Sequence, residues 1–154
     1  RKAPCIFFCR NNGYAISTPV ERQFASDGIA PKGAGYGIKA IRVDGNDFFA
    51  VYDAVSSAKK HALEGNGPVL IEAMTYRMGP HSTSDDPTRY RKDEDVEKWR
   101  LSCPVLRLRK YLEEKGLWNT GLEEKYKAEI VKEIDEAIEK AKNTAKPPRE
   151  SLIE

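Results

Sequence analysis

Length, composition and charge place this chain among ordinary globular domains. It has 154 residues, of which 40% are hydrophobic and 32% are charged, and this length suits a single domain. The net charge of +2 is too small to indicate nucleic-acid binding. No apolar run approaches the ~20 residues that a membrane helix needs. We therefore expect no nucleic acid and no membrane among its partners.

The first ten residues and the cysteines narrow the context. The chain lacks an initiator methionine, and RKAP leads almost directly into the apolar run CIFFC, which indicates a piece of a longer protein. Cys5, Cys9 and Cys103 form no CxxC pair. This pattern favours reduced, buried thiols in an intracellular compartment over a zinc site or a disulfide.

The run Cys5–Cys9 predicts the first strand. Because it is apolar at every position, we expect both of its faces to be covered, as in a parallel sheet. The polar turn Arg10–Gly13 follows, at the end of a strand where open α/β sheets bind ligands. The glycine-rich stretch 28–37 lacks the spacing of a dinucleotide fingerprint, and we interpret it as a flexible connection.

A strand–helix–strand unit comes next. Lys39–Val43 reads as a strand, and Asp44–Asp47 as a turn that caps a helix. Phe48–Leu63 has apolar residues near the helical spacing of 3.6, and Val69–Tyr76 is a second covered strand. Short connections of this kind predict parallel strands.

Two polar residues in this unit have a bland and a functional interpretation. Glu72 lies inside the second covered strand, where a paired structural carboxylate is favoured over a site residue. His61 lies on the helix and is most simply a surface residue.

Helices are predicted for the rest of the chain. Asp93–Arg100 and Val105–Glu114 are the first two, and a third begins with Thr120 as its cap and ends near Lys142. An apolar stripe on the third helix predicts packing against a neighbour, with the charged face in water. Its members are Leu122, Tyr126, Ile130, Ile134, Ala137, Ile138 and Ala141. The fold class is thus α/β: a parallel sheet with flanking helices, plus C-terminal helices.

The segment Arg77–Arg91, RMGPHSTSDDPTRYR, has the most unusual composition. Glycine and two prolines forbid a continuous helix or a paired strand, so it is a loop at a strand end. A solvated polar turn is the bland interpretation. Against it, a histidine, hydroxyls, carboxylates and arginines gather within fifteen residues and can form an ordered, charge-assisted network.

The two polar turns suit one ligand if they share an edge of the sheet. An arginine and amides suit a phosphate, while an asparagine oxygen and a backbone carbonyl suit Mg²⁺, a hard cation that prefers oxygen. A carboxylate ligand is still needed, and we expect it upstream of Arg1. The residues alone predict an anion-and-metal site without naming the ligand.

Three segments resemble a known family. They are FFCRNNGYAIS at Phe7–Ser17, IRVDGND at Ile41–Asp47, and AMTYRMGPHSTSDD at Ala73–Asp86, followed by Tyr90 and Arg91. The chain resembles the α subunit of the branched-chain 2-oxo acid dehydrogenase E1 component, of the thiamine diphosphate-dependent E1 family. The resemblance covers nearly the whole chain and implies the C-terminal half of a thiamine diphosphate-binding fold.

The resemblance also implies a cofactor site. Asn12 would give its side chain, and Tyr14 its backbone carbonyl, to Mg²⁺. Arg10 would contact the diphosphate, and Ile16 would lie under the thiazolium and hold the cofactor bent. His81 would touch the diphosphate and assist acyl transfer to the lipoyl arm of E2.

Loop control is implied as well. Ser82 matches a site that a kinase phosphorylates in mitochondrial members, where a phosphate would repel the diphosphate. Residues that would order the loop are Arg77, Asp85, Tyr90 and Arg91. Pro80 stands where many members have a second histidine, and Lys92 where some have a second phosphorylated serine.

Partners, location and domains follow from the same resemblance. We expect an E1β subunit in an α2β2 tetramer, a lipoyl-bearing E2, and a regulatory kinase and phosphatase. The location would be the mitochondrial matrix in a eukaryote and the cytoplasm otherwise. Residues 1–91 would form a partial thiamine diphosphate-binding domain, and 92–154 a helical segment that packs on it or on a partner subunit.

Three alternatives remain at this point. One is the pyruvate or acetoin enzyme of the same superfamily. Another is a non-catalytic scaffold or partner-binding domain that keeps the fold, since two features that the resemblance implies upstream, a GDG motif of the metal site and the substrate pocket, are absent from these residues. A nucleotide-binding domain ranks last, because no phosphate-loop signature is present. As a fragment, the chain would be inactive.

Overall fold

The computed structural model describes residues 2–152 and divides the chain into two compact units, Arg1–Lys110 and Tyr111–Glu154, which we treat separately. The predicted domain assignment, 1–91 and 92–154, stays a prediction. In chain order the elements are β1 (Ile6–Asn11), β2 (Tyr14–Ala15), β3 (Thr18–Pro19), η1 (Val20–Arg22), α1 (Lys32–Gly35), β4 (Lys39–Asp44), α2 (Phe48–His61), η2 (Ala62–Asn66), β5 (Val69–Met74), η3 (Pro87–Arg89), α3 (Asp93–Arg100), α4 (Pro104–Glu114), α5 (Thr120–Asn143) and η4 (Arg149–Leu152).

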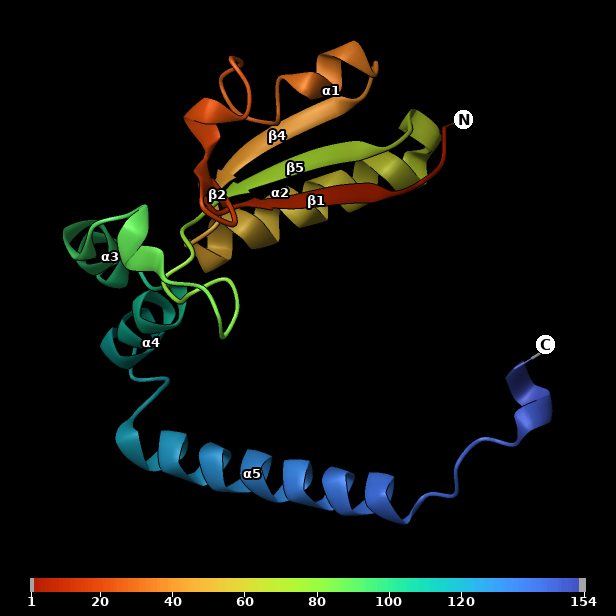
Figure 1. Ribbon diagram of the computed structural model, residues 1–154, viewed down its shortest axis with the longest axis vertical. Helices are drawn as coiled ribbons and strands as arrows, with labels where there is room; N and C mark the ends of the chain where they lie inside the picture. Colours follow the sequence, from red (N-terminus) through yellow and green to blue (C-terminus); the bar gives the residue numbers. More distant parts are fainter. Residues whose placement is uncertain (1, 153–154) are drawn as a thin grey trace. The chain divides into compact units, whose positions relative to one another are not determined.

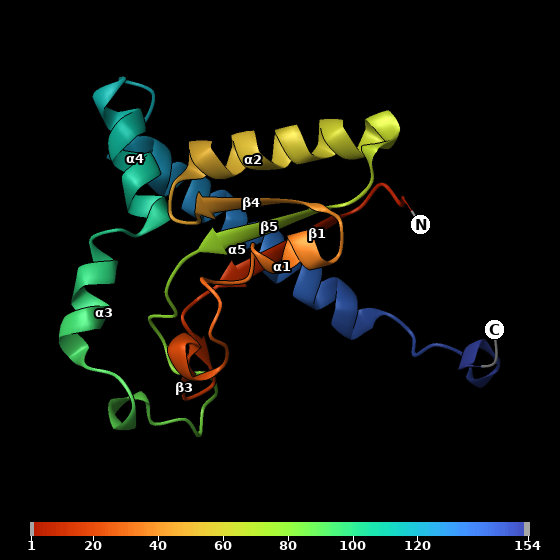
Figure 2. The ribbon, with the colours of Figure 1, turned by 90° about the horizontal axis from the view of Figure 1, so that it is seen from above.

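A parallel sheet in the order β1-β5-β4 forms the centre of the first unit. Helix α2 covers one face of it, while α1 and the glycine-rich segment lie on the other (Figures 1 and 2). The α/β class with a parallel sheet and flanking helices is therefore confirmed. Strand β5, at the centre, is the most deeply buried element.

The core lies between β5 and α2. Ala58, Val69 and Ile71 are fully buried there. The helix approaches the sheet through small residues near helical spacing. Phe48 and Tyr52 are two of the apolar residues whose spacing predicts the helix, and they are 51% and 63% exposed. The expectation that these two side chains belong to the buried face is wrong, because the residues that α2 buries are the alanines Ala54 and Ala58. His61 is half-buried rather than a plain surface residue.

Helix α2 begins at the predicted residue and ends at His61, two residues before the predicted end at Leu63. The carboxylate of Asp47 accepts a hydrogen bond from the backbone N–H of Ala50 at 3.0 Å, which confirms the predicted cap. A single π-helical turn, η2, follows the helix. Gly65 and Gly67 then take positive φ angles of 79° and 96°, a conformation that glycine adopts without steric cost.

Strand β1 differs from its prediction in two ways. It continues through Asn11 rather than ending at Cys9. It is also an edge strand of the described sheet, so Phe7 and Phe8 are 55% and 42% exposed. The expectation of a strand covered on both faces was wrong for this chain, because α2 packs mainly on β4 and β5 and leaves these side chains of β1 exposed. The three cysteines are free, as predicted, although each is half-buried.

The glycine-rich segment is more ordered than we predicted. It contains the short helix α1, and Gly33 is buried against the side chain of Ala40. Gly28 has a φ of +81° and lies against Arg42 and Glu72. The interpretation as a flexible connection was wrong, because tertiary contacts that no local pattern reveals fix this segment.

Helix α5 dominates the second unit. Its cap is Asn119, whose side-chain oxygen accepts from the backbone N–H of Leu122 at 3.0 Å, so the predicted cap at Thr120 is one residue late. Trp118 stacks on Tyr126 with ring centroids 5.6 Å apart. Exposed members of the predicted stripe, with 45–53% of their surface accessible, are Tyr126, Ile130, Ile134 and Ile138. Within residues 2–152, no helix has the length and apolar character needed to cross a membrane.

Gly28 gives a direct test of this packing. A Cβ at this position would lie 2.3 Å from Arg42 Nη2 and 2.7 Å from Glu72 Oε1, on a backbone with positive φ. We expect Gly28→Ala to lower the stability of the full-length protein by more than about 1 kcal/mol, seen as a lower melting temperature. Gly35→Ala is the control, since nothing lies within 4 Å of a Cβ there. Equal melting temperatures for both variants would contradict this packing.

Candidate functional site

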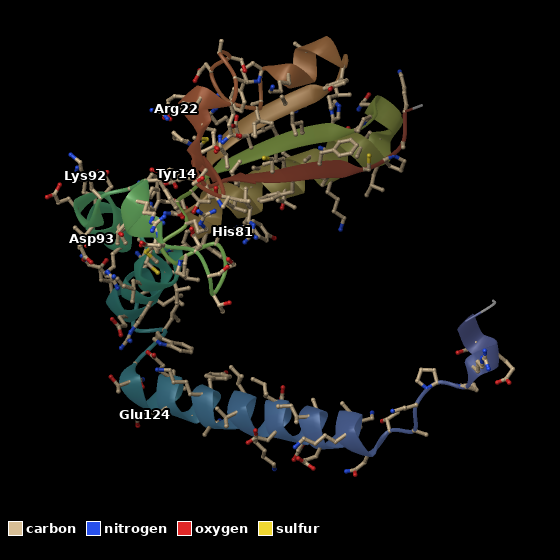
Figure 3. All side chains as sticks on the ribbon, in the orientation of Figure 1. Tyr14, Arg22, His81, Lys92, Asp93 and Glu124 are labelled. Carbon is tan, nitrogen blue, oxygen red and sulfur yellow. The ribbon has the colours of Figure 1, made fainter. Side chains whose placement is uncertain are left out.

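The two polar turns leave the sheet at the same edge. Strands β1 and β5 are parallel neighbours, and Asn11 pairs in register with Met74. The backbone N–H of Thr75 donates to the carbonyl of Asn11 at 2.9 Å. Figure 3 shows Tyr14 and His81 at this end of the sheet. The turn after β1 and the loop after β5 thus lie beside one another.

Consecutive asparagines shape the turn after β1. The side-chain oxygen of Asn11 accepts the backbone N–H of Gly13, and that of Asn12 accepts the N–H of Tyr14, each at 3.1 Å. Gly13 takes a φ of 84° between them. These bonds fix which way the amide oxygens point, and each oxygen keeps a second lone pair for another partner.

A buried carboxylate holds this turn from behind. Glu72 has no exposed surface and uses both oxygens. Its donors are the side-chain amide of Asn11 (2.7 Å), the backbone N–H groups of Ile29 (2.8 Å) and Ala30 (2.7 Å), and Nε of Arg42 (3.1 Å). Burial alone would raise the pKa of Glu72, but these hydrogen bonds outweigh it and hold the pKa below its ordinary value. The structural interpretation of Glu72 therefore holds, and through Asn11 it also reaches the turn.

Ile16 is strained. It has a φ of 55°, which is a genuine outlier for a β-branched residue and costs on the order of 1–3 kcal/mol. Its carbonyl accepts a hydrogen bond from Arg77 Nη2 at 2.5 Å. Its side chain is 54% exposed. The strain holds an apolar side chain at the surface of the edge that carries both turns.

The loop after β5 is tied together by the four residues that we expected to order it. Asp85 accepts the backbone N–H of His81 at 2.8 Å and the hydroxyl of Tyr90 at 2.6 Å. Arg77 donates to that hydroxyl at 3.0 Å. Arg91 donates to three carbonyls, those of Arg77, Met78 and Gly79. The loop is thus an ordered network rather than a solvated turn.

Aromatic rings join the loop to the turn. The ring of Tyr14 contacts Tyr76 and Tyr90 at centroid distances of 6.0 and 5.6 Å. Tyr76 stacks on Trp99 of α3 at 5.5 Å, nearly parallel, and the guanidinium of Arg91 lies 5.6 Å from the centre of the Tyr76 ring. Burial raises the pKa of Tyr76 above its ordinary value.

Sequence reasoning missed a second polar cluster at this edge. Arg107 of α4 forms ion pairs with Asp44 (2.9 Å) and Asp47 (3.1 Å) and donates to the carbonyl of Asn46. The buried Asn46 side chain in turn accepts from the hydroxyl of Thr75 at 2.7 Å. Arg107 follows Asp44 by 63 positions, so no local spacing signals the pair.

Neighbouring residues at the end of β1 point to opposite faces of the sheet. Arg10 pairs in register with Ala73 and so lies on the α2 side of the sheet, while Asn11 lies on the Glu72 side. Arg10 borders a cavity of about 300 Å³ together with Phe8, Asn46 and Trp99. His81 and Ser82 are exposed on the loop, and Ser82 Oγ lies 3.2 Å from Ser84 Oγ.

The donor set in this part of the protein suits a hard cation only in part. Asn12 offers an amide oxygen that the turn orients, and such oxygens suit Mg²⁺. No group of three or more histidine, cysteine or carboxylate side chains within residues 2–152 has the geometry of a metal site. Within the described residues, Asn12 thus offers one oriented oxygen donor that would suit a hard cation.

Known proteins identify the family. Residues 1–150 match the family model described as the dehydrogenase E1 component. The chain belongs to this family. It is 52% identical over 147 residues to the mouse (Mus musculus) protein named 2-oxoisovalerate dehydrogenase subunit alpha, mitochondrial. The aligned residues make up 95% of the chain and 33% of that relative. This match confirms the predicted resemblance to the E1 α subunit.

Plant and nematode relatives agree. The Arabidopsis thaliana 2-oxoisovalerate dehydrogenase subunit alpha 1, mitochondrial, is 50% identical over 153 residues, covering 99% of the chain and 32% of the relative. The Caenorhabditis elegans subunit alpha, mitochondrial, is 54% identical over 134 residues, covering 86% of the chain and 31% of the relative. The chain thus spans about a third of the length of these relatives.

Asp85 allows a test of loop order by pH. The N–H of His81, then the hydroxyl of Tyr90, hold its pKa below the ordinary value. A lowered folded pKa means that the carboxylate stabilises the loop fully above the ordinary pKa and stops doing so as pH falls through the folded pKa. We expect Asp85→Asn to raise amide exchange over residues 77–85 at neutral pH. In the parent protein exchange there should increase as pH falls through the folded pKa of Asp85, and this increase should be absent in the variant.

The neighbouring Asp86 is the control for this experiment. Its carboxylate bonds only within η3, to Thr88 and Arg89, so Asp86→Asn should leave exchange over residues 77–82 unchanged. Hydrogen–deuterium exchange, corrected for the intrinsic rate at each pH, measures both variants. Similar exchange in Asp85→Asn and the parent protein would contradict the proposed order.

Proposed function

We propose that this chain is part of an E1 α subunit that decarboxylates branched-chain 2-oxo acids and reductively acylates the lipoyl group of E2. The observation that carries the proposal is about 50% identity to 2-oxoisovalerate dehydrogenase α subunits over nearly the whole chain, combined with an amide turn and a histidine loop on one edge of the sheet. The chain would act as an oxidoreductase only within the whole protein.

Thiamine diphosphate is the cofactor of the dehydrogenase E1 family, and we propose Mg²⁺ as its bridge to this chain. When bound, the cofactor supplies the electron sink that lets a 2-oxo acid lose carbon dioxide. Asn12 would give its oriented amide oxygen, and Tyr14 its carbonyl, to the cation. Arg10, an exposed guanidinium at the end of β1, would bind a diphosphate oxygen.

Ile16 and His81 would act beside the reacting part of the cofactor. The strained backbone of Ile16 presents an apolar side chain, which suits contact with the flat ring of a bent cofactor. His81 is exposed on a loop whose backbone Asp85 holds. There it would donate a hydrogen bond to the diphosphate and a proton during acyl transfer to the lipoyl group.

The alternatives are less well supported. The relatives described above carry the 2-oxoisovalerate name, which favours the branched-chain substrate over pyruvate or acetoin. A non-catalytic scaffold would not need the strain at Ile16 or the ordered His81 loop. We further propose an E1β subunit in an α2β2 tetramer and an E2 partner. The relatives' names print a mitochondrial location, and within the mitochondrion we propose the matrix.

The decisive experiment uses the full-length α subunit assembled with its β subunit. We expect decarboxylation of 3-methyl-2-oxobutanoate that requires thiamine diphosphate and Mg²⁺. Asn12→Ala should weaken metal binding by more than roughly 100-fold, the upper range for loss of a group that merely supports a ligand. In this variant the Mg²⁺ concentration needed for half-maximal decarboxylation should therefore rise.

The variant His81→Ala distinguishes acyl transfer to the lipoyl group from the preceding decarboxylation. It should reduce reductive acylation of a lipoyl domain more than decarboxylation measured with an artificial electron acceptor. His61→Ala is the matched control, because His61 is the only other histidine and lies on α2. No decarboxylation by the assembled parent protein at saturating cofactor and Mg²⁺ would refute the proposed function.

We propose that phosphorylation of Ser82 would weaken cofactor binding and so switch the enzyme off. A phosphate there would place nearly two negative charges beside the proposed diphosphate site. We expect Ser82→Asp to raise the dissociation constant for thiamine diphosphate roughly tenfold, as a repulsion of about 1.4 kcal/mol would. Ser57→Asp, on the exposed side of α2, should have no effect. Equal cofactor affinity in Ser82→Asp and the parent protein would contradict the switch.

A further inference from the structure

The buried carboxylate of Glu72 is fully saturated with donors. Two reach each oxygen, and together they occupy the four lone-pair sites that a carboxylate offers. A neutral glutamine of the same shape would offer one oxygen and would turn an NH₂ group toward two N–H donors. The site is therefore built for a charged carboxylate and for no isosteric neutral side chain.

One of the four donors leads directly to the turn after β1. Asn11 donates its side-chain NH₂ to Glu72 Oε1 at 2.7 Å. This bond turns the amide so that its oxygen faces the other way, toward the N–H of Gly13 at 3.1 Å. Asn11 is only 5% exposed, so neither contact is replaced easily by water. Asn11 thus ties Gly13, in the turn that contains Asn12 and leads to Tyr14, to the buried carboxylate of Glu72.

Stability alone does not account for such an arrangement. A well-packed apolar side chain in place of a buried charge is often neutral or stabilising. Here the charge instead joins β5 through Asn11 to the turn, and through Arg42 and the N–H groups of Ile29 and Ala30 to β4 and the glycine-rich segment. The carboxylate fixes the turn in relation to the central strand of the sheet.

We propose that Glu72 and Asn11 are a positioning pair that presents the side-chain oxygen of Asn12 and the carbonyl of Tyr14 to a divalent cation. This inference rests on the proposed function, since it concerns the same metal turn. Neither Glu72 nor Asn11 touches the cation. Partners that orient metal ligands typically contribute about 10- to 100-fold to metal affinity, and we expect an effect of that size here.

The test measures metal binding as well as activity. Mn²⁺ serves as the probe, and the signal of free Mn²⁺ in electron paramagnetic resonance gives its dissociation constant in the assembled α2β2 protein with thiamine diphosphate present. Glu72→Gln and Asn11→Ala should each raise that constant about 10- to 100-fold. Decarboxylation by both variants should recover at high metal concentration, because the ligands themselves remain.

A double variant tests whether the two residues act along one route. If Glu72 acts through Asn11, the double variant should bind Mn²⁺ about as weakly as the weaker single variant, rather than showing the product of both effects. Asn11→Ala keeps the carboxylate and three of its donors, so it serves as the test if Glu72→Gln fails to assemble. Glu72→Asp, which keeps the charge, should recover part of the affinity.

Val69→Ala is the matched control. Val69 is fully buried on β5 but has no bond to the turn, so this variant should lower the melting temperature and leave Mn²⁺ binding unchanged. Mn²⁺ affinities of Asn11→Ala and Glu72→Gln that equal the parent value would overturn the proposal, as would multiplicative effects in the double variant. If Asn12→Ala also leaves Mn²⁺ binding unchanged, the proposed function fails with it.

Discussion

The four hydrogen bonds to one buried carboxylate organise the first unit. Glu72 has no exposed surface, and an ionised group in that position would be very costly without donors. Its partners come from β1, β4 and the glycine-rich segment before α1. Segments that are distant in sequence therefore meet because this charge must be satisfied. The edge that carries Asn12 inherits its geometry from that requirement.

Local patterns predicted the strands and helices of this unit well. Asp47, the glycines near position 66 and the helical spacing between them fix the bounds of α2, and short connections imply parallel strands. These features depend on neighbours in sequence. The order of the glycine-rich segment could not be predicted, because the backbone N–H groups of Ile29 and Ala30 are held by Glu72, more than forty positions away. The cluster around Arg107 escaped for the same reason.

In the candidate site, too, the sequence indicated some features and not others. The residue types in the turn after β1 and in the loop after β5 drew attention to these two segments, and the structure places both at one edge of the sheet. What the sequence could not reveal was the conformation. A positive φ at Ile16 contradicts the propensity of a β-branched residue. The opposite directions of Arg10 and Asn11 follow from strand alternation, but only because β1 continues through Asn11 instead of ending at Cys9.

Burial errors in the sequence analysis also have a physical cause. Periodicity says which side chains need covering, and it does not say which segment covers them. Phe7 and Phe8 on edge strand β1 remain exposed, as do Ile130 and Ile134 on α5. The relatives are about three times longer than this chain. The turn after β1 is held by hydrogen bonds inside this chain, whereas the exposed apolar side chains of β1 and α5 are left uncovered by residues 2–152.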